Sequence, residues 1–204
     1  GGITQKFDTR ITAKEVEAAL KSFDGEIEQI PPIYSAIKVN GKKLYDYARK
    51  GQEVEIKPRR VNIYEIKLQD FDEEKQAAVI KVACSKGTYI RSIAYDLGKI
   101  LHSGGHLIAL ERTKAGSFTI ENTVKLENLT RENIVQKIIN PIEILPQEKY
   151  ILSEEEKERV CHGQSLKIQN SLLTPVVFFV YSDKILGVGQ VDGQRILVKK
   201  VFAV

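Results

Sequence analysis

The sequence lacks the features of a membrane or secreted protein. No apolar run approaches the roughly 18 to 20 residues that a membrane-spanning helix needs. Residues 1–6 also lack the apolar segment of a secretory signal peptide. With 204 residues and a hydrophobic content of 42%, the chain is predicted to form one substantial globular domain, or one with a small appendage. We expect a cytoplasmic location.

Cysteine and histidine are scarce. The two cysteines, Cys84 and Cys161, lie far apart, and without a secretory signal they are expected to be free, buried thiols. The three histidines lack the paired spacing of a zinc site, and neither Cys-x-x-Cys nor His-Glu-x-x-His occurs. The sequence therefore predicts no metal site.

Positive charge is concentrated in one segment. Residues 38–60 hold eight basic and three acidic side chains, a net charge of +5, whereas the whole chain carries +4. Tyr34, Tyr45 and Tyr47 lie in or beside this segment. Cations that neutralise phosphates and rings that stack on bases suit a polyanion such as nucleic acid. From charge alone, a solvated lysine-rich surface is the simpler interpretation.

The pattern of apolar residues predicts mixed α and β structure in the first half of the chain. Thr12 and Glu15 form a capping box before a helix over residues 13–24. β-Branched residues over 61–68 and 77–84 predict an antiparallel pair of strands. Apolar residues at helical spacing then predict a second helix over residues 90–101. A short apolar run over residues 106–110 is expected to form a further strand.

The character of the chain changes between Pro141 and Pro146. Ser153 and Glu156 form a second capping box, on a short charged helix that Gly163 ends. Short strands are then predicted over 174–181, 184–191 and 195–201, with Asp192-Gly193 as a hairpin signal. This pattern indicates a small β-barrel appended to the main domain.

Arg91 lies where the predicted strand gives way to the predicted helix, in CSKGTYIRSIAYDLG (residues 84–98). A guanidinium keeps its charge, so it needs a carboxylate, a phosphate or solvent as its partner. The positive end of the helix dipole makes the first turn unfavourable for a cation. An anion near Arg91 is therefore plausible, and an ordinary surface arginine is the alternative.

That stretch and the following GGHLIALER (residues 104–112) resemble the signature of the TruB family of tRNA pseudouridine synthases. Upstream, IPPIYSAIKVNGKKLYDYARKG (residues 30–51) is similar to the Pro-x-Tyr-Ser-Ala-x-Lys block of the same family. Near the end, GVGQVD (residues 187–192) and RILVKKVF (residues 195–202) resemble a PUA domain, a small RNA-binding β-barrel. The tail match is weaker than the two central blocks.

The resemblance implies an α+β fold in two parts. Residues 1–145 would form part of the mixed, mostly antiparallel-sheet catalytic domain of a pseudouridine synthase, and residues 146–204 a PUA-like barrel. The implied activity is the isomerisation of uridine 55 in the tRNA T-loop, with the T-arm stem-loop as partner. The implied enzyme is expected to act as a monomer and to need no metal or organic cofactor.

The resemblance also implies roles for three residues. The arginine at position 91 would pair with the catalytic aspartate, favouring the ionised carboxylate and fixing its orientation. Tyr89 and Leu110 would line the uracil pocket, the first with an aromatic ring and the second with apolar packing. Without the resemblance, core packing explains Tyr89 and Leu110 equally well.

The sequence departs from the family pattern at the nucleophile. The family's aspartate lies in a Gly-x-Leu-Asp-Pro segment, which does not occur here, and no Lys-x-Tyr precedes the first block. All eight aspartates stand in other contexts. They are Asp8, Asp24, Asp46, Asp70, Asp72, Asp96, Asp183 and Asp192. We therefore expect these residues to correspond to the C-terminal two-thirds of such an enzyme and to be inactive alone.

Two other functions fit the same residues. One is a non-catalytic RNA-binding or RNA-folding protein that keeps the basic surface and the barrel. The other is a guide-RNA-directed pseudouridine synthase, which shares these motifs within a larger ribonucleoprotein. The short tail and the lack of long basic extensions favour the tRNA enzyme.

Charge and aromatic character predict that six residues contact RNA. They are Tyr34, Lys38, Lys42, Lys86, His106 and Arg112. Charge-neutral substitutions at Lys38 and Lys42 should weaken tRNA binding and flatten its dependence on salt, because fewer counterions would be released. Dissociation constants measured over a range of salt concentrations check this prediction. Unchanged slopes would remove both lysines from the set of phosphate contacts.

Overall fold

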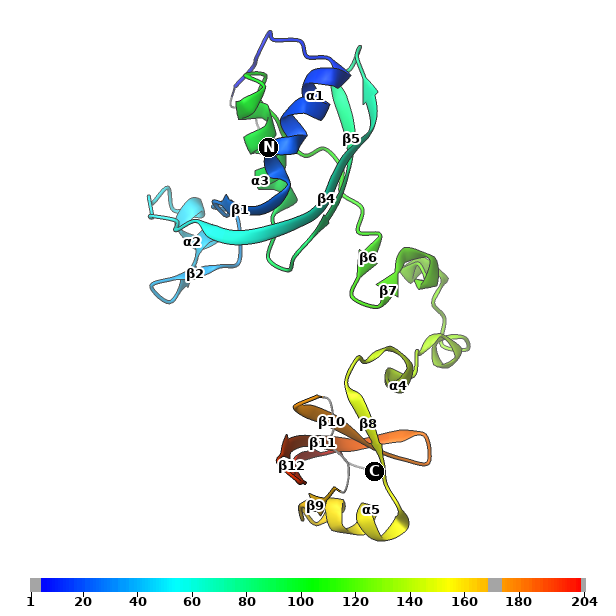
Figure 1. Cartoon of the computed structure of the whole chain (residues 1–204). Coiled ribbons are helices and arrows are strands. Elements are labelled where there is room, and N and C mark those ends of the chain that lie inside the picture. Colours follow the sequence, from blue (N-terminus) through cyan, green and yellow to red (C-terminus); the bar gives the residue numbers. More distant parts are fainter. Residues whose placement is uncertain (1–4, 169–173, 203–204) are drawn as a thin grey trace. The chain divides into compact units, whose positions relative to one another are not determined.

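The computed structural model describes residues 5–168 and 174–202, and the chain forms two compact units, residues 1–110 and 111–204 (Figure 1). The sequence places the boundary between two domains at residue 145. That boundary stays a prediction, because the two compact units are separated by their internal contacts alone. Among the described residues, no helix combines the length and apolar character needed to cross a membrane.

Unit 1 is built on a three-stranded antiparallel sheet with the order β1-β4-β5 (Figure 1). β4 (Arg59–Asp72) pairs with β5 (Ala77–Cys84), which confirms the predicted antiparallel pair. β1 (Gly25–Gln29) pairs with the beginning of β4 and was not predicted. Its sequence, GEIEQ, has one large apolar residue, so its pattern carries little strand signal.

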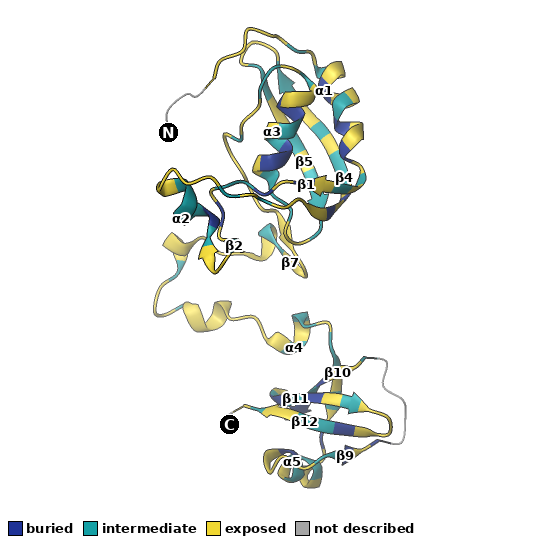
Figure 2. Ribbon diagram, turned by 90° about the vertical axis from the view of Figure 1, so that its left-hand side faces the viewer, coloured by how far each residue is buried: buried dark blue, intermediate teal, exposed yellow. Residues whose placement is uncertain are grey.

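Two helices pack on one face of this sheet (Figures 1 and 2). α1 (Ala13–Leu20) starts with the predicted Thr12–Glu15 capping box and continues into a 3₁₀ turn, η1 (Lys21–Phe23). α3 (Ile90–Ile100) confirms the second predicted helix. The core between helices and sheet brings together residues distant in sequence. They are Val16, Leu20, Phe23, Ile63, Ile93 and Leu97.

The opposite face of the sheet is polar. The Glu65 carboxylate forms ion pairs with Lys67, at 2.6 Å, and with Lys81, at 3.4 Å. Tyr64 exposes 65% of its surface. At the β1 edge, Arg60 pairs with Glu26 at 3.4 Å. Ion pairs thus neutralise this face, and the cations without such partners lie elsewhere in the unit.

A small module follows β1. It consists of β2 (Lys38–Val39), β3 (Lys42–Lys43) and α2 (Leu44–Arg49). Asn40 and Gly41 connect the two strands with φ angles of 50° and 79°, the conformation that a two-residue hairpin turn requires. Leu44 is fully buried and anchors the module.

The chain returns along α3 after that helix ends. Gly98 lies against the backbone of Gly104 and Gly105, and the main-chain N–H groups of Ser103 and Gly104 donate to the carbonyl of Gly98, each at 3.1 Å. The prediction of a strand over residues 106–110 is wrong. This run pairs with none of the described strands, and Ile108 exposes 76% of its surface. A short apolar run does not by itself provide the neighbouring backbone that a strand needs.

Unit 2 contains a five-stranded sheet with the order β8-β10-β11-β12-β9. β10 (Val176–Tyr181), β11 (Lys184–Asp192) and β12 (Arg195–Val201) confirm the three predicted strands. β8 (Glu148–Ile151) and β9 (Leu166–Lys167) were not predicted, because they are short and polar. The two parts together confirm the expected α+β class, with a small second sheet.

α5 (Glu154–Cys161) packs beside this sheet and starts with the predicted Ser153–Glu156 capping box. The segment before β8 holds only short elements. They are β6 (Lys114–Ala115), β7 (Phe118–Thr119), η2 (Ile120–Asn122), η3 (Leu126–Asn128), η4 (Ile134–Lys137) and α4 (Pro141–Ile144). The second core cluster lies in this unit and includes the fully buried Phe179 and Ile196.

Both cysteines are free, as expected, but the prediction that both are buried is wrong for Cys161. Cys84 is half-buried at the end of β5, where it packs against the core of unit 1. Cys161 is exposed because it is the last residue of α5, a helix that fully buries only Val160.

Replacing Gly98 by alanine should destabilise unit 1 strongly. A Cβ atom there would lie 2.1 Å from the backbone nitrogen of Gly105, so the returning chain would have to move. Overpacking of this kind costs about 3 kcal/mol. Urea unfolding of Gly98→Ala checks this value, with Glu17→Ala on the exposed face of α1 as a control expected within about 0.5 kcal/mol of the original. An unchanged midpoint for Gly98→Ala would contradict the close contact.

The stability of unit 2 should fall between pH 10 and 12. The Tyr150 hydroxyl donates to Glu156 at 2.8 Å. Burial, with this hydrogen bond, raises the pKa of Tyr150 from 10.0 to about 12. As the pH rises, the Tyr150 hydroxyl therefore loses its proton in the unfolded chain before it does so in the folded chain. The stabilisation that this hydroxyl provides below pH 10 is then lost.

Tyr150→Phe should flatten this pH dependence and cost about 1 to 2 kcal/mol at neutral pH, because it removes a hydrogen bond to a carboxylate. Thermal unfolding of both proteins from pH 7 to 12 checks the prediction. Tyr64→Phe, at an exposed position of unit 1, is the control. Parallel curves for the original chain and Tyr150→Phe would show that Tyr150 does not carry the effect.

Candidate functional site

The two sequence blocks that carry the family resemblance lie side by side in unit 1. Gln29 ends β1, and its side-chain amide holds the backbone of Tyr89: Oε1 accepts the Tyr89 N–H at 2.7 Å, and Nε2 donates to the Tyr89 carbonyl at 3.1 Å. The Ser92 hydroxyl donates to the carbonyl of Ile30 at 2.8 Å. These bonds bring the segment after β1 against the first turn of α3.

Arg91 occupies the second position of α3, and its side chain is exposed. Its Nη2 donates to the carbonyl of Tyr34 at 3.1 Å. No ion pair among the described residues includes Arg91. The nearest acid on its helix is Asp96, half-buried, where burial raises the pKa of the carboxyl and Lys99 opposes that shift. The guanidinium therefore keeps N–H donors available for an anion.

Tyr89 is the residue that precedes the first helical turn of α3, and its side chain is half-buried. Leu110 exposes 62% of its surface at the end of unit 1. Tyr89 and Arg91 are adjacent through the backbone. Among the described residues, no hydrogen bond and no core cluster joins Leu110 to either of them, so its place in the site stays a prediction.

The basic module presents its lysines on two faces. Lys38 lies opposite Lys43 across the hairpin, while Lys42 lies opposite Val39. Directly opposed side chains share a face of a two-stranded ribbon, so Lys38 and Lys43 stand together and Lys42 points to the other side. Lys38 and Lys42 are exposed. Like charges facing each other are unfavourable unless an anion is near, and the Lys38–Lys43 pair fits a polyanion.

Tyr45 is the centre of a cation–aromatic cluster in the same module. The Lys43 ammonium lies 5.3 Å and the Arg49 guanidinium 5.2 Å from the centre of its ring. A hydrogen bond with Tyr45 raises the pKa of Lys43. The Tyr47 hydroxyl donates to the Val39 carbonyl at 3.1 Å and fastens α2 to the hairpin. The cluster holds positive charge at a defined place on the surface.

The other predicted contacts are all solvent-accessible. Tyr34 exposes 59% of its surface, and Lys86 and His106 are exposed. Arg112 is exposed too, but it belongs to unit 2, so it is described separately from the rest. The structure thus brings Tyr34 and Arg91 into contact and places Lys38 and Lys42 on one hairpin.

Sequence analysis missed three polar residues that the structure buries at this place. They are Gln29, Ser35 and Ser92, which expose 2%, 6% and 6% of their surface. Gln29 and Ser92 bind backbone groups, whereas no described partner meets the Ser35 hydroxyl. The partners of Gln29 and Ser92 lie about sixty residues away in the sequence, so no local pattern could have revealed the roles of these two residues. The Lys43–Tyr45–Arg49 cluster, by contrast, could have been found from the spacing of Tyr45 and Arg49 on a helix.

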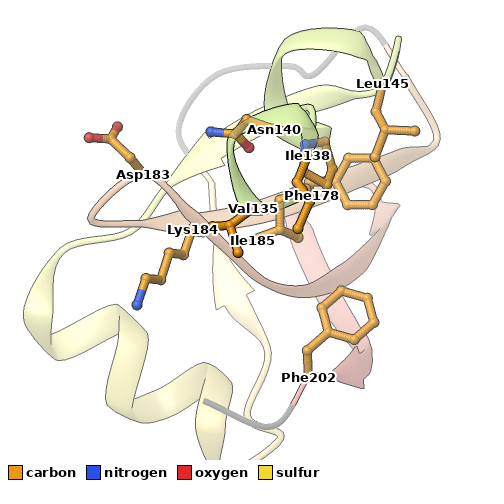
Figure 3. A pocket seen from close by; sticks show the side chains of 10 residues that line it. Val135, Ile138, Asn140, Leu145, Phe178, Asp183, Lys184, Ile185 and Phe202 are labelled. Atoms are coloured by element: carbon orange, nitrogen blue, oxygen red, sulfur yellow. The ribbon is translucent and has the colours of Figure 1, made fainter. Parts of the chain in front are cut away.

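The described residues include no group of three histidine, cysteine, aspartate or glutamate side chains that could hold a metal ion. A hollow of about 370 Å³ lies beside the hairpin, and Lys38, Lys57 and Arg59 are among the residues that line it. A larger hollow, about 660 Å³, lies in unit 2 (Figure 3). Ile138, Phe178 and Ile185 are among the apolar residues that line it, and Asn140, Asp183 and Lys184 add polar groups.

Comparison with known proteins gives a family match over most of the chain. Residues 1–90 match the description "TruB family pseudouridylate synthase (N terminal domain)", and residues 91–145 match "tRNA pseudouridylate synthase B C-terminal domain". The tRNA pseudouridine synthase B of Francisella philomiragia is 42% identical over 196 residues, 94% of this chain and 64% of that protein. The protein of the same name from Oceanobacillus iheyensis is 38% identical, covering 95% of this chain and 67% of that protein. The chain thus spans about two-thirds of the length of these relatives.

Solved structures share the fold at lower identity. A Cbf5-Nop10-Gar1 complex contains a chain that matches 97% of this one with a TM-score of 0.67 and 20% identity. An H/ACA RNP bound to a substrate RNA containing 2'-deoxyuridine gives the same TM-score and identity over 98% of this chain. At this level of identity the likeness concerns the fold alone.

Proposed function

Because the chain belongs to the TruB family of pseudouridylate synthases, we propose that its protein isomerises uridine 55 in the T-loop of tRNA to pseudouridine. The observation that carries the proposal is the contact between the two family blocks. Arg91 and the Ser92 hydroxyl from one block donate to the carbonyls of Tyr34 and Ile30 in the other. Gln29, the residue just before that block, binds the backbone of Tyr89. The relatives with 38% and 42% identity, both named tRNA pseudouridine synthase B, favour tRNA over a guide-directed substrate.

In the proposed reaction the target uridine leaves its stack and enters a pocket beside Tyr89. An aspartate acts as the essential group while the bond between the ribose C1' and uracil N1 breaks. The base turns, a bond forms between C1' and C5, the C5 proton leaves to solvent, and N1 takes up a proton. The balance requires no oxidant and no co-substrate. Tyr89 supplies an aromatic wall, and Leu110 an apolar one.

Arg91 is proposed to hold the carboxylate of that aspartate. Among the described residues, Tyr34 is its one hydrogen-bond partner, through the backbone carbonyl, and its side chain is exposed. A guanidinium can meet a carboxylate through two parallel N–H bonds, which fixes the orientation of the acid and favours its ionised form. The Gly-x-Leu-Asp-Pro motif is absent from these residues, so we propose that they need a segment carrying it for turnover.

The basic module is proposed to bind the T-arm. Lys38, Lys42 and the hollow beside the hairpin present positive charge that can meet phosphates, while Tyr34 offers a ring for stacking. Lys86, His106 and, in unit 2, Arg112 would add contacts. Residues 146–204, a part of unit 2, are proposed to act as a PUA-like RNA-binding domain. The protein would act as a monomer in the cytoplasm, where it would meet tRNA.

Tritium release from C5-labelled uridine in a T-arm RNA tests the proposal. These residues alone should bind the RNA and release no tritium, because no aspartate is placed beside Arg91. The same residues joined to a segment carrying the family's Gly-x-Leu-Asp-Pro motif should release it. In that longer protein Arg91→Ala should lower the rate about a hundredfold, the size of effect seen when one preorganised charged contact is removed.

Arg10→Ala is the matched control, because Arg10 also donates one side-chain bond to a backbone carbonyl, that of Glu73, within unit 1. It should leave the rate unchanged. Release by the present residues alone would show that one of their own aspartates does the chemistry. RNA binding without release, even with the added segment, would favour the non-catalytic RNA-binding function instead.

A further inference from the structure

Gln29 is a buried polar residue, and both the oxygen and the nitrogen of its side-chain amide are hydrogen-bonded. It exposes 2% of its surface, and both ends of its amide bind the same residue, Tyr89, which is 60 positions away. The amide acts as a neighbouring strand would, since it offers one acceptor to the N–H and one donor to the carbonyl. Leaving such buried groups without partners costs about 1 to 3 kcal/mol each. The contact is therefore both specific and costly to break.

The residue that Gln29 holds is the one at which the loop becomes a helix. Tyr89 has φ −100° and ψ 107°, outside the helical region, and α3 has no side-chain cap at this end. The peptide groups on either side of Tyr89 thus set where its ring points and where α3 begins. Because Arg91 follows within the first turn, the same bonds set the position of its guanidinium.

Two more bonds fasten the segment that begins at Gln29, residues 29–34, to the same turn. We call this segment the strap. Ser92 donates to the Ile30 carbonyl at 2.8 Å, and Arg91 to the Tyr34 carbonyl at 3.1 Å. Pro31 and Pro32 lie between these points, and their rings fix φ. The strap is therefore stiff, and its backbone follows any movement of the helix start.

We propose that Gln29 is a positioning residue for the uridine site, one that holds Tyr89 and Arg91 in the arrangement that receives the uracil and the carboxylate. The inference rests on the proposed function. It requires an amide at this position, because leucine would leave the Tyr89 N–H without its partner and the Tyr89 carbonyl with only the helical N–H groups of Ser92 and Ile93. An ionised glutamate would place a second acceptor against the Tyr89 carbonyl.

The chain contains a matched control for this role. Gln76 makes the same pair of bonds with Ile11, where Oε1 accepts the N–H at 2.8 Å and Nε2 donates to the carbonyl at 3.2 Å. These groups lie in the same unit but hold the approach to α1 and not the start of α3. Gln76→Leu should therefore lower stability without changing the site.

The test compares the affinity of the chain for an RNA that carries the target base with its affinity for the same RNA without that base. Fluorescence anisotropy gives dissociation constants for a T-arm stem-loop with uridine at the target position and for the same stem-loop with an abasic site there. Both are measured well below the unfolding midpoints of all variants. Gln29→Leu should lower the preference for uridine about tenfold, while Gln76→Leu should leave the preference unchanged. Amide exchange followed by NMR should show at least tenfold faster exchange at Tyr89 in Gln29→Leu alone.

Gln29→Glu supplies a rescue experiment that remains usable if Gln29→Leu does not fold. A protonated carboxyl offers one donor and one acceptor, as the amide does, and burial raises the pKa of a carboxyl. In this variant the preference for uridine and the protection of the Tyr89 amide should be present near pH 5 and lost near pH 8. The original chain should keep both over this range.

A Gln29→Leu protein that keeps its preference for uridine would overturn the inference and leave the proposed function standing. So would a Gln29→Glu protein whose preference does not change with pH. RNA binding by the original chain with no preference for uridine would contradict the proposed function, and the positioning role with it.

Discussion

The candidate site depends on the start of α3, a helix that has no side-chain cap of its own. At the end of β1, the amide of Gln29 binds the N–H and the carbonyl of Tyr89, just before the first turn of α3. Within that turn, the Ser92 hydroxyl donates to the carbonyl of Ile30. Buried polar groups without partners are costly, so this part of the fold has one favourable arrangement. That arrangement places Tyr89 and Arg91 together at the surface of unit 1.

The electrostatics of unit 1 separate into two regions. On the outer face of the sheet and along β1, lysine and arginine are met by Glu65 and Glu26. On the hairpin, Lys38 and Lys43 face each other across the ribbon, and Lys43 is held against Tyr45. The exposed ion pairs of Glu65 and Glu26 add little to stability. The lysines of the hairpin add to the electrostatic field that attracts a polyanion. The ion pairs of the sheet thus leave the hairpin lysines as a separate positively charged region of unit 1.

Family membership and site geometry support each other but rest on different observations. The family match depends on residues shared with relatives over residues 1–145. The geometry depends on bonds between two segments of this chain. The solved structures of 20% identity share the fold alone. What would set the proposed enzyme apart is the proposed pairing of Arg91 with a carboxylate, since a chain could keep the basic hairpin and the second sheet without it.

The sequence by itself determined the elements whose causes are local. Both capping boxes join residues three positions apart, at Thr12 and Ser153, and the strands of β4, β5 and β10 to β12 follow from runs of β-branched residues. The blocks around Tyr34 and Arg91 identified the family from consecutive residues. The strand expected over residues 106–110 failed because a strand needs a neighbour, which a five-residue apolar run does not specify. Only the tertiary structure decided that Gln29 holds Tyr89, that Ser92 meets Ile30 and that Arg91 reaches the Tyr34 carbonyl. These partners lie about sixty residues apart, and the packing of α1 and α3 on the sheet, not any local pattern, brings them within hydrogen-bonding distance.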